Sequence, residues 1–211
     1  MPQRQRTRKR RVRTARRESS DYRQVSALAS GTSTCLSRDR ASRLRTYCHW
    51  VTDDSFPWKD ELVSIADRLE AKTKQKRWTV RTGYLIERDF VVGAYAMRKL
   101  IESHKVSDEL RGRQFPVRRY DSTGNPPEPP SPDDIADSYD FENGLRRALS
   151  VGDLCHEIVQ SFTFTFCCGE TTDLFDGVYV SSDRDKNEYV LLVLASDFIA
   201  LCGDIGTEDH A

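Results

Sequence analysis

Long apolar runs are missing from this chain of 211 residues. No window approaches the roughly 18 consecutive apolar residues that a transmembrane helix needs, so we expect no membrane-spanning segment. Cysteine is scarce as well, because six residues in the whole chain are too few for the disulfide scaffold of a small secreted protein. Internal repeats are also absent. These observations predict a cytoplasmic protein with one ordinary domain and, at most, one appendage.

Several motifs of enzymes and metal proteins are missing too. The sequence has no Gly-x-Gly-x-x-Gly fingerprint, no phosphate-binding Gly-rich loop, no Gly-x-Ser-x-Gly element and no Cys-x-x-Cys pair. Dinucleotide-binding, serine-hydrolase and zinc-ribbon functions therefore have no motif to support them. We expect no cofactor and no bound metal.

Basic residues are concentrated in the first fifty positions, although the formal net charge of the whole chain is zero. Residues 1–50 hold 14 Lys and Arg against three acidic residues, a balance of +11, and the remainder carries −11. We predict a disordered basic arm over residues 1–50, because its few apolar side chains cannot offset the entropy lost on ordering. Its densest cations are Arg8, Lys9, Arg10, Arg11, Arg13, Arg16 and Arg17.

Four interpretations of this arm remain open. Its guanidinium groups can pair with nucleic-acid phosphates and release counterions, which would give non-specific binding. It can be an organelle transit peptide, although its basic cluster lacks the leucines of an amphipathic helix. It can fold back on the acidic remainder of the chain, or it can be an over-extended translation start. Under the first interpretation, we expect the affinity for nucleic acid to reside in the arm.

Two helices are predicted at the start of the folded body, residues 51–211. Over residues 57–76, apolar side chains recur at helical spacing, and Pro57 suits a first turn. These apolar residues are Leu62, Ile65, Ala66 and Leu69. Over residues 79–105 the apolar band is wider, and the small residue Gly93 at its centre would permit close contact between helices. We expect this second helix to form the core.

The rest of the body predicts a single α+β domain. Prolines and glycines over residues 112–140 indicate a long surface loop. Ser150 can cap a third helix by accepting a hydrogen bond from the backbone N–H of Asp153. Alternating apolar residues then predict a three-stranded antiparallel meander, over residues 162–166, 177–182 and 188–194. A short C-terminal helix is expected to open at Ser196.

Candidate chemistry centres on the third helix. His156 and Glu157 begin a pattern one substitution short of the zinc-protease motif His-Glu-x-x-His. Gln160 stands where the second metal-binding imidazole is needed, and an amide is a poor zinc ligand. We retain Asp153, His156 and Glu157 as the candidate catalytic residues.

Two further patterns fall short of a metal site. The turn before the last predicted strand imitates the first half of a calcium loop, but Glu188 replaces the required glycine and Leu194 the required glutamate. Three cysteines flank the junction of helix and strand, namely Cys155 on one side and the neighbouring pair Cys167 and Cys168 on the other. We interpret them as buried free thiols. If a metal were found, Cys155, Cys167 and His156 would be the first ligands to test.

Two segments of the sequence resemble a group of uncharacterised bacterial proteins. The first is Arg88-Asp89 followed by Ala94-Tyr95-Ala96-Met97-Arg98-Lys99-Leu100. The second is Leu154-Cys155-His156-Glu157-Ile158-Val159-Gln160-Ser161. The overall plan is also similar to HEPN-type helical domains, small bundles found in bacterial defence and toxin–antitoxin systems. HEPN ribonucleases carry an Arg-(polar)-x-x-x-x-His motif, and this chain has Gln160 where the histidine would fall.

The incomplete catalytic patterns favour a non-enzymatic interaction or regulatory protein of bacterial type. Its partner would be another protein, a second copy of the chain, or nucleic acid held by the basic arm. The alternative hypothesis is a degenerate HEPN-like ribonuclease or nucleic-acid-processing factor. That factor would use His156, Glu157 and nearby basic residues.

Overall fold

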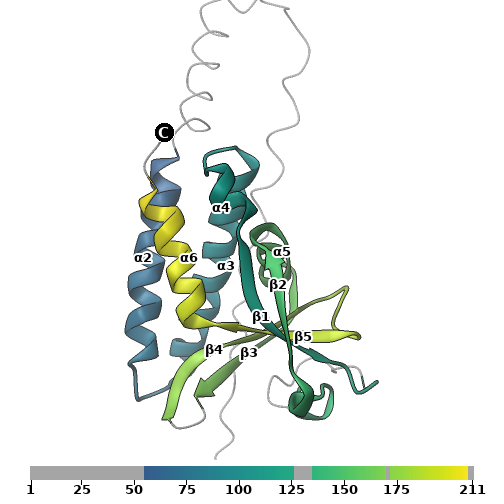
Figure 1. Cartoon of the computed structure of the whole chain (residues 1–211). Helices are drawn as coiled ribbons and strands as arrows, with labels where there is room; N and C mark the ends of the chain where they lie inside the picture. Colours follow the sequence, from purple (N-terminus) through teal and green to yellow (C-terminus); the bar gives the residue numbers. More distant parts are fainter. Residues whose placement is uncertain (1–54, 126–134, 170–171, 209–211) are drawn as a thin grey trace, which may run out of the picture. The chain divides into compact units, whose positions relative to one another are not determined.

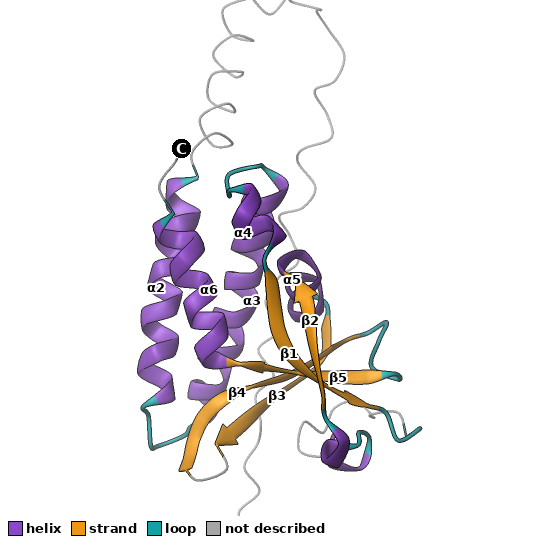
Figure 2. Cartoon of the chain, viewed as in Figure 1, coloured by secondary structure: helices purple, strands orange, loops and turns teal. Residues whose placement is uncertain are grey.

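The computed structural model describes residues 55–125, 135–169 and 172–208, so the predicted basic arm lies outside the described residues. The elements are, in order, α2 (Phe56–Thr73), α3 (Val80–Glu102), α4 (Asp108–Gly112), β1 (Gln114–Asp121), η1 (Ile135–Asp137), η2 (Phe141–Asn143), β2 (Leu145–Ser150), α5 (Val151–Val159), β3 (Ser161–Gly169), β4 (Thr172–Ser182), β5 (Tyr189–Leu194) and α6 (Ala195–Thr207). Figure 1 and Figure 2 show α2, α3 and α6 as a bundle beside the strands. No helix within the described ranges is both long and apolar enough to cross a membrane.

The two long predicted helices are confirmed as α2 and α3. The Thr79 hydroxyl caps α3 by accepting from the Thr82 N–H at 3.1 Å. After the helix, His104 adopts a φ of 55° and the next residue donates its N–H to the Leu100 carbonyl at 2.9 Å, which satisfies a carbonyl of the last turn. Gly93 lies against the Phe198 ring of α6, so the expected close contact at this glycine is confirmed.

The strands form one antiparallel sheet of five strands in the order β2-β1-β5-β4-β3. The fold class α+β is therefore confirmed. The prediction of a three-stranded meander is wrong in the number of strands. The three predicted strands do exist as β3, β4 and β5, and they pair in sequence order. Two further strands, β1 and β2, extend the sheet beyond β5.

Each of the two unpredicted strands has a feature that weighs against a strand, although buried Phe115 and Val117 do alternate with exposed residues in β1. The loop predicted over residues 112–140 is wrong where it overlaps β1, and residues 126–134 lie outside the described ranges. Pro116 pairs with Ala148 of β2, but pairing of β1 with β5 begins only at Arg118. At Pro116 β1 is therefore an edge strand, where a proline is tolerated. In β2 the residues from Leu145 to Ala148 are all exposed, so no alternation of apolar and polar side chains marks the strand.

The last helix is longer than predicted. α6 spans 13 residues and its N-cap is Leu194, so the predicted opening at Ser196 and the short length are both wrong. The chain passes directly from β5 into α6, which leaves no polar capping residue to read from the sequence. α6 packs along α2 and adds Phe198 and Ile205 to the main core.

Both faces of the sheet are covered by apolar side chains, but unequally. The main core lies between the sheet and helices α2, α3, α5 and α6. The opposite face carries a small second cluster in which half-buried Phe141, Tyr179 and Leu192 pack on four buried residues, which are Tyr120, Ile135, Tyr139 and Val190. One face of the sheet is therefore covered by helices, whereas the other carries only this small cluster.

Candidate functional site

A cavity of about 480 Å³ opens between α3, α5 and the turn that joins β4 to β5. The three candidate residues predicted from the sequence all line it, namely Asp153, His156 and Glu157. Arg98 of α3, Arg184 of the turn and Tyr189 of β5 line it as well. Sequence reasoning missed these three, because each comes from a distant part of the chain.

The start of α5 positions two of the candidate residues. The Ser150 hydroxyl accepts from the Asp153 N–H at 3.1 Å, which confirms the predicted cap. It also donates to the Asp153 carboxylate at 2.7 Å. His156 follows three residues later and so lies on the same side of the helix. Since α5 ends at Val159, Gln160 lies beyond the last helical residue, and the zinc-protease pattern has no second ligand.

Glu157 belongs to a buried pair of carboxyl groups. Its side chain is 4 % exposed, and its Oε2 accepts from the Ser182 N–H at 3.0 Å. The second member is Asp185, whose carboxylate accepts from the Ser182 hydroxyl at 3.0 Å and from the Arg184 guanidinium at 2.8 Å. The charged turn predicted between the last two strands is therefore confirmed, and it brings a second carboxyl group to Glu157.

The two neighbouring carboxyl groups have opposite pKa shifts. Burial raises the pKa of Glu157, and the adjacent Asp185 carboxylate adds to that rise. The hydrogen bond from Arg184 holds the pKa of Asp185 well below its usual range. As the pH rises, Glu157 is therefore the member of the pair that loses its proton later. Paired groups whose pKa values are pushed apart in this way can act as an acid and a base.

The variant Glu157→Gln is expected to be less sensitive to rising pH than the wild type. Because the folded-state pKa of Glu157 is raised, the wild type loses stability as the pH rises from the ordinary value of 4.5 through that raised pKa. A glutamine does not titrate, and its amide oxygen can still accept from Ser182. Thermal melts from about pH 4.5 to about pH 8 should show a growing advantage of the variant. Melting curves that stay parallel across this range would contradict the assignment.

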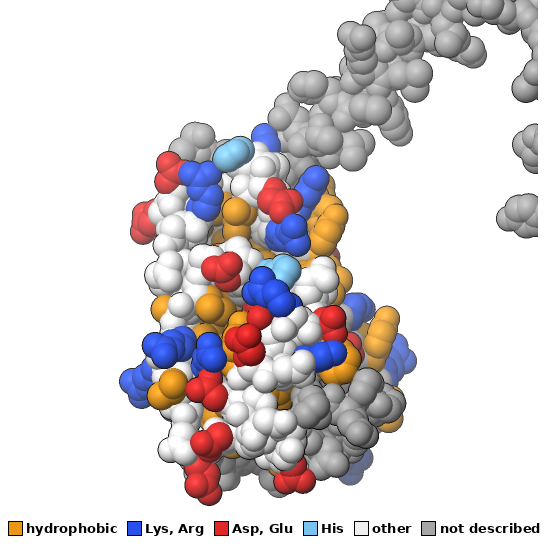
Figure 3. Space-filling view, turned by 90° about the vertical axis from the view of Figure 1, so that its right-hand side faces the viewer, with side chains coloured by type: hydrophobic (Ala, Val, Ile, Leu, Met, Phe, Trp, Pro, Cys, Tyr) orange, Lys and Arg blue, Asp and Glu red, His pale blue; other side chains and the backbone are white. Residues whose placement is uncertain are grey.

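Most charged side chains around the cavity already have partners within the protein. Arg98 Nε lies 2.7 Å from the Glu102 carboxylate, and Arg184 Nη2 lies 2.8 Å from Asp185. Within the described ranges, the His156 imidazole makes no hydrogen bond or ion pair. Figure 3 shows a face on which acidic and basic side chains are mixed around histidine. The cavity thus offers a free imidazole but no unpaired guanidinium.

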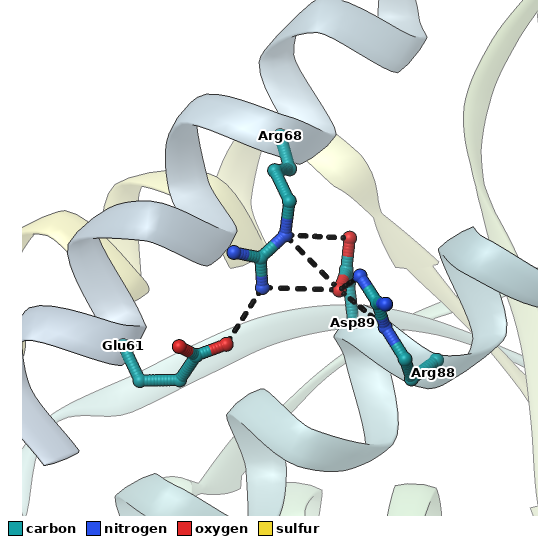
Figure 4. A network of polar contacts seen from close by, with 4 residues as sticks. All are labelled: Glu61, Arg68, Arg88 and Asp89. Atoms are coloured by element: carbon teal, nitrogen blue, oxygen red, sulfur yellow. Dashed lines mark hydrogen bonds and ion pairs between the residues drawn. The ribbon is translucent and has the colours of Figure 1, made fainter.

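A second polar network joins α2 to α3, and none of its members lines the cavity (Figure 4). The Asp89 side chain, 2 % exposed, accepts from Arg68 Nη2 at 3.1 Å and from Arg88 Nη2 at 2.7 Å. Arg68 also contacts Glu61 at 2.7 Å. The hydrogen bond to Asp89 raises the pKa of the Arg68 guanidinium. Two carboxylates balance two guanidinium groups here, so this network is a structural connection between helices.

The described cysteines have different surroundings. The prediction of buried thiols is confirmed for Cys155, but it is wrong for Cys168, which is exposed, and Cys167 is half-buried. Burial raises the pKa of the Cys155 thiol to about 12, so this residue is not a nucleophile. Within the part of the chain that the structure describes, no three potential ligands gather in an arrangement that could hold a metal ion.

Comparison of the chain with known protein families, with curated proteins and with solved structures finds no match.

Proposed function

We propose that this protein is a non-enzymatic interaction or regulatory protein. The observation that carries the proposal is the pairing of charges at the cavity, where Glu102 holds Arg98 and Asp185 holds Arg184. Catalytic sites keep donors aimed at the charge that develops in the transition state. Here the protein's own carboxylates already occupy those donors, which supports binding rather than catalysis.

The proposed partner and location follow from charge and thiol chemistry. Residues 1–50 carry a balance of +11, which supports a polyanionic partner such as nucleic acid. A cytoplasmic location fits the thiols of Cys155, Cys168 and Cys202, because a reducing compartment preserves thiols.

The second candidate function is a HEPN-like ribonuclease or nucleic-acid-processing factor. One observation favours it, because His156 and Glu157 line the same cavity as two arginines. A free imidazole could serve as general base, and Glu157, whose pKa is raised by burial, as general acid. In this candidate, Arg98 and Arg184 would have to leave their carboxylate partners to reach a scissile phosphate.

Incubation of the full-length protein with end-labelled RNA separates the two functions. We expect the RNA to remain intact, because no guanidinium at the cavity is free to stabilise the transition state. The variant His156→Ala removes the free imidazole, and Gln160→Ala is a matched control at the end of the same helix, outside the cavity lining. Cleavage by the wild type and by Gln160→Ala, but not by His156→Ala, would refute the leading proposal and establish the second.

A further inference from the structure

Two arginines lie directly opposite each other on the unpredicted strands. The antiparallel register pairs Arg118 of β1 with Arg146 of β2, and both side chains are exposed. Opposed residues have Cβ atoms only about 4.5–5.5 Å apart, so two like charges in these positions repel each other. Neither guanidinium has an ion pair or hydrogen bond within the described residues. An anion placed between them would relieve the repulsion.

These arginines lie on the sheet face that the helices do not cover. Phe115 and Val117 of β1 belong to the main core, and successive residues of a strand point to opposite faces. Arg118 therefore points away from the helices, and Arg146 shares its face because the two residues are directly opposed. This is the face that carries the second cluster around Tyr120.

Partly exposed aromatic rings lie next to the arginine pair. The rings of Tyr120 and Phe141 are 5.0 Å apart between centroids, and those of Phe141 and Tyr179 are 5.1 Å apart. Burial raises the pKa of Tyr179, and the nearby positive charge of Arg118 opposes that rise. Phe141 and Tyr179 are only half-buried, so both residues keep part of their surface accessible.

We propose that this arginine–aromatic face, made of Arg118, Arg146, Phe141 and Tyr179, binds single-stranded nucleic acid. The inference rests on the proposed interaction function and names its partner. Guanidinium groups pair with backbone phosphates, and aromatic rings stack on bases, which only single strands expose. An acidic peptide would satisfy the arginines alone, and a duplex would hide its bases from the rings. The sequence alone places the affinity for nucleic acid in the basic arm, and this face is a second, structurally defined binding surface.

Binding titrations of the full-length chain test the arginines. The variant Arg118→Gln/Arg146→Gln is compared with Lys76→Gln/Arg77→Gln, which removes the same charge from exposed residues of the turn between α2 and α3. We expect roughly 10-fold weaker binding of labelled single-stranded RNA or DNA in the first variant, and a salt slope lower by about 1.4 for two lost phosphate contacts. The control should change by less than about twofold. The first variant should melt no lower than the wild type, because a repulsion is removed.

A third variant tests the aromatic part of the face. Phe141→Leu keeps an apolar side chain in the second cluster but removes the accessible ring. We expect several-fold weaker binding at an unchanged salt slope, because stacking releases no counterions. Titrations with RNA and with DNA together show whether the 2′-hydroxyl of the sugar contributes to the affinity.

Three results would overturn the inference. The first is that the arginine variant and its control weaken oligonucleotide binding equally, which would mean that only the overall positive charge attracts the nucleic acid. The second is duplex DNA bound as tightly as a single strand. The third is a poly-glutamate peptide that competes as well as the oligonucleotide, which would indicate an acidic protein partner. All three leave the interaction function standing, whereas RNA cleavage that depends on His156 would refute that function.

Discussion

Replacing Phe90 with alanine is expected to lower the free energy of unfolding by about 3–5 kcal/mol. The Phe90 side chain is fully buried, and its ring stacks on Phe198 with 4.3 Å between centroids. It also packs edge-to-face with Phe164 and Phe175, so the residue joins α3 to α6 and to the sheet. Alanine leaves a cavity at this junction that neighbouring rings can fill only in part. Urea denaturation measures the loss.

Tyr84→Ala is the matched control for this prediction. Tyr84 lies on the same helix but is 63 % exposed, so its loss should change the free energy of unfolding by no more than about 0.5 kcal/mol. Equal destabilisation by the two variants would mean that Phe90 is not at the centre of the core.

Asp89→Ala is expected to cost about 3 kcal/mol of stability. The buried carboxylate is the shared partner of Arg68 and Arg88, and its removal leaves Arg68 with Glu61 alone and takes from Arg88 its ion pair beside the helix interface. The value is at the lower end for a broken buried pair, because Arg68 is 36 % exposed and water can solvate it. Chemical denaturation at about neutral pH measures the effect.

Glu87→Ala provides the control for Asp89. It removes one exposed carboxylate from the same helix, and we expect a change within about 0.5 kcal/mol. If Asp89→Ala and Glu87→Ala destabilise the protein equally, the network shown in Figure 4 is a surface feature of little energetic weight.

Helices α2 and α3 could be predicted from the sequence because their buried residues repeat every three or four positions. The middle of the chain could not. Pro116 weighed against a strand, and the exposed side chains of β2 carried no apolar signal, yet pairing with β5 and β1 placed both strands in the sheet. The prediction failed for β1 because Pro116 outweighed the alternation of buried Phe115 and Val117, and for β2 because only non-local pairing marks that strand.

The candidate site was half predictable for a similar reason. Asp153, His156 and Glu157 are neighbours on one helix, so their proximity follows from local spacing. Arg98 and Asp185 reach them only through the packing of α3 and of the β4–β5 turn against α5. Likewise, the register of β1 and β2 opposes Arg118 and Arg146, which are far apart in sequence, so no motif could reveal the pair.

The central claim is that this protein binds nucleic acid without cleaving it. Labelled single-stranded RNA, incubated with the full-length protein and divided between a native and a denaturing gel, tests both parts at once. The account predicts a retarded band on the native gel, weakened in Arg118→Gln/Arg146→Gln, and RNA of unchanged length on the denaturing gel. RNA that is shortened by the wild type but stays at full length with His156→Ala would contradict the account. RNA that is not retarded by the wild type would contradict it as well.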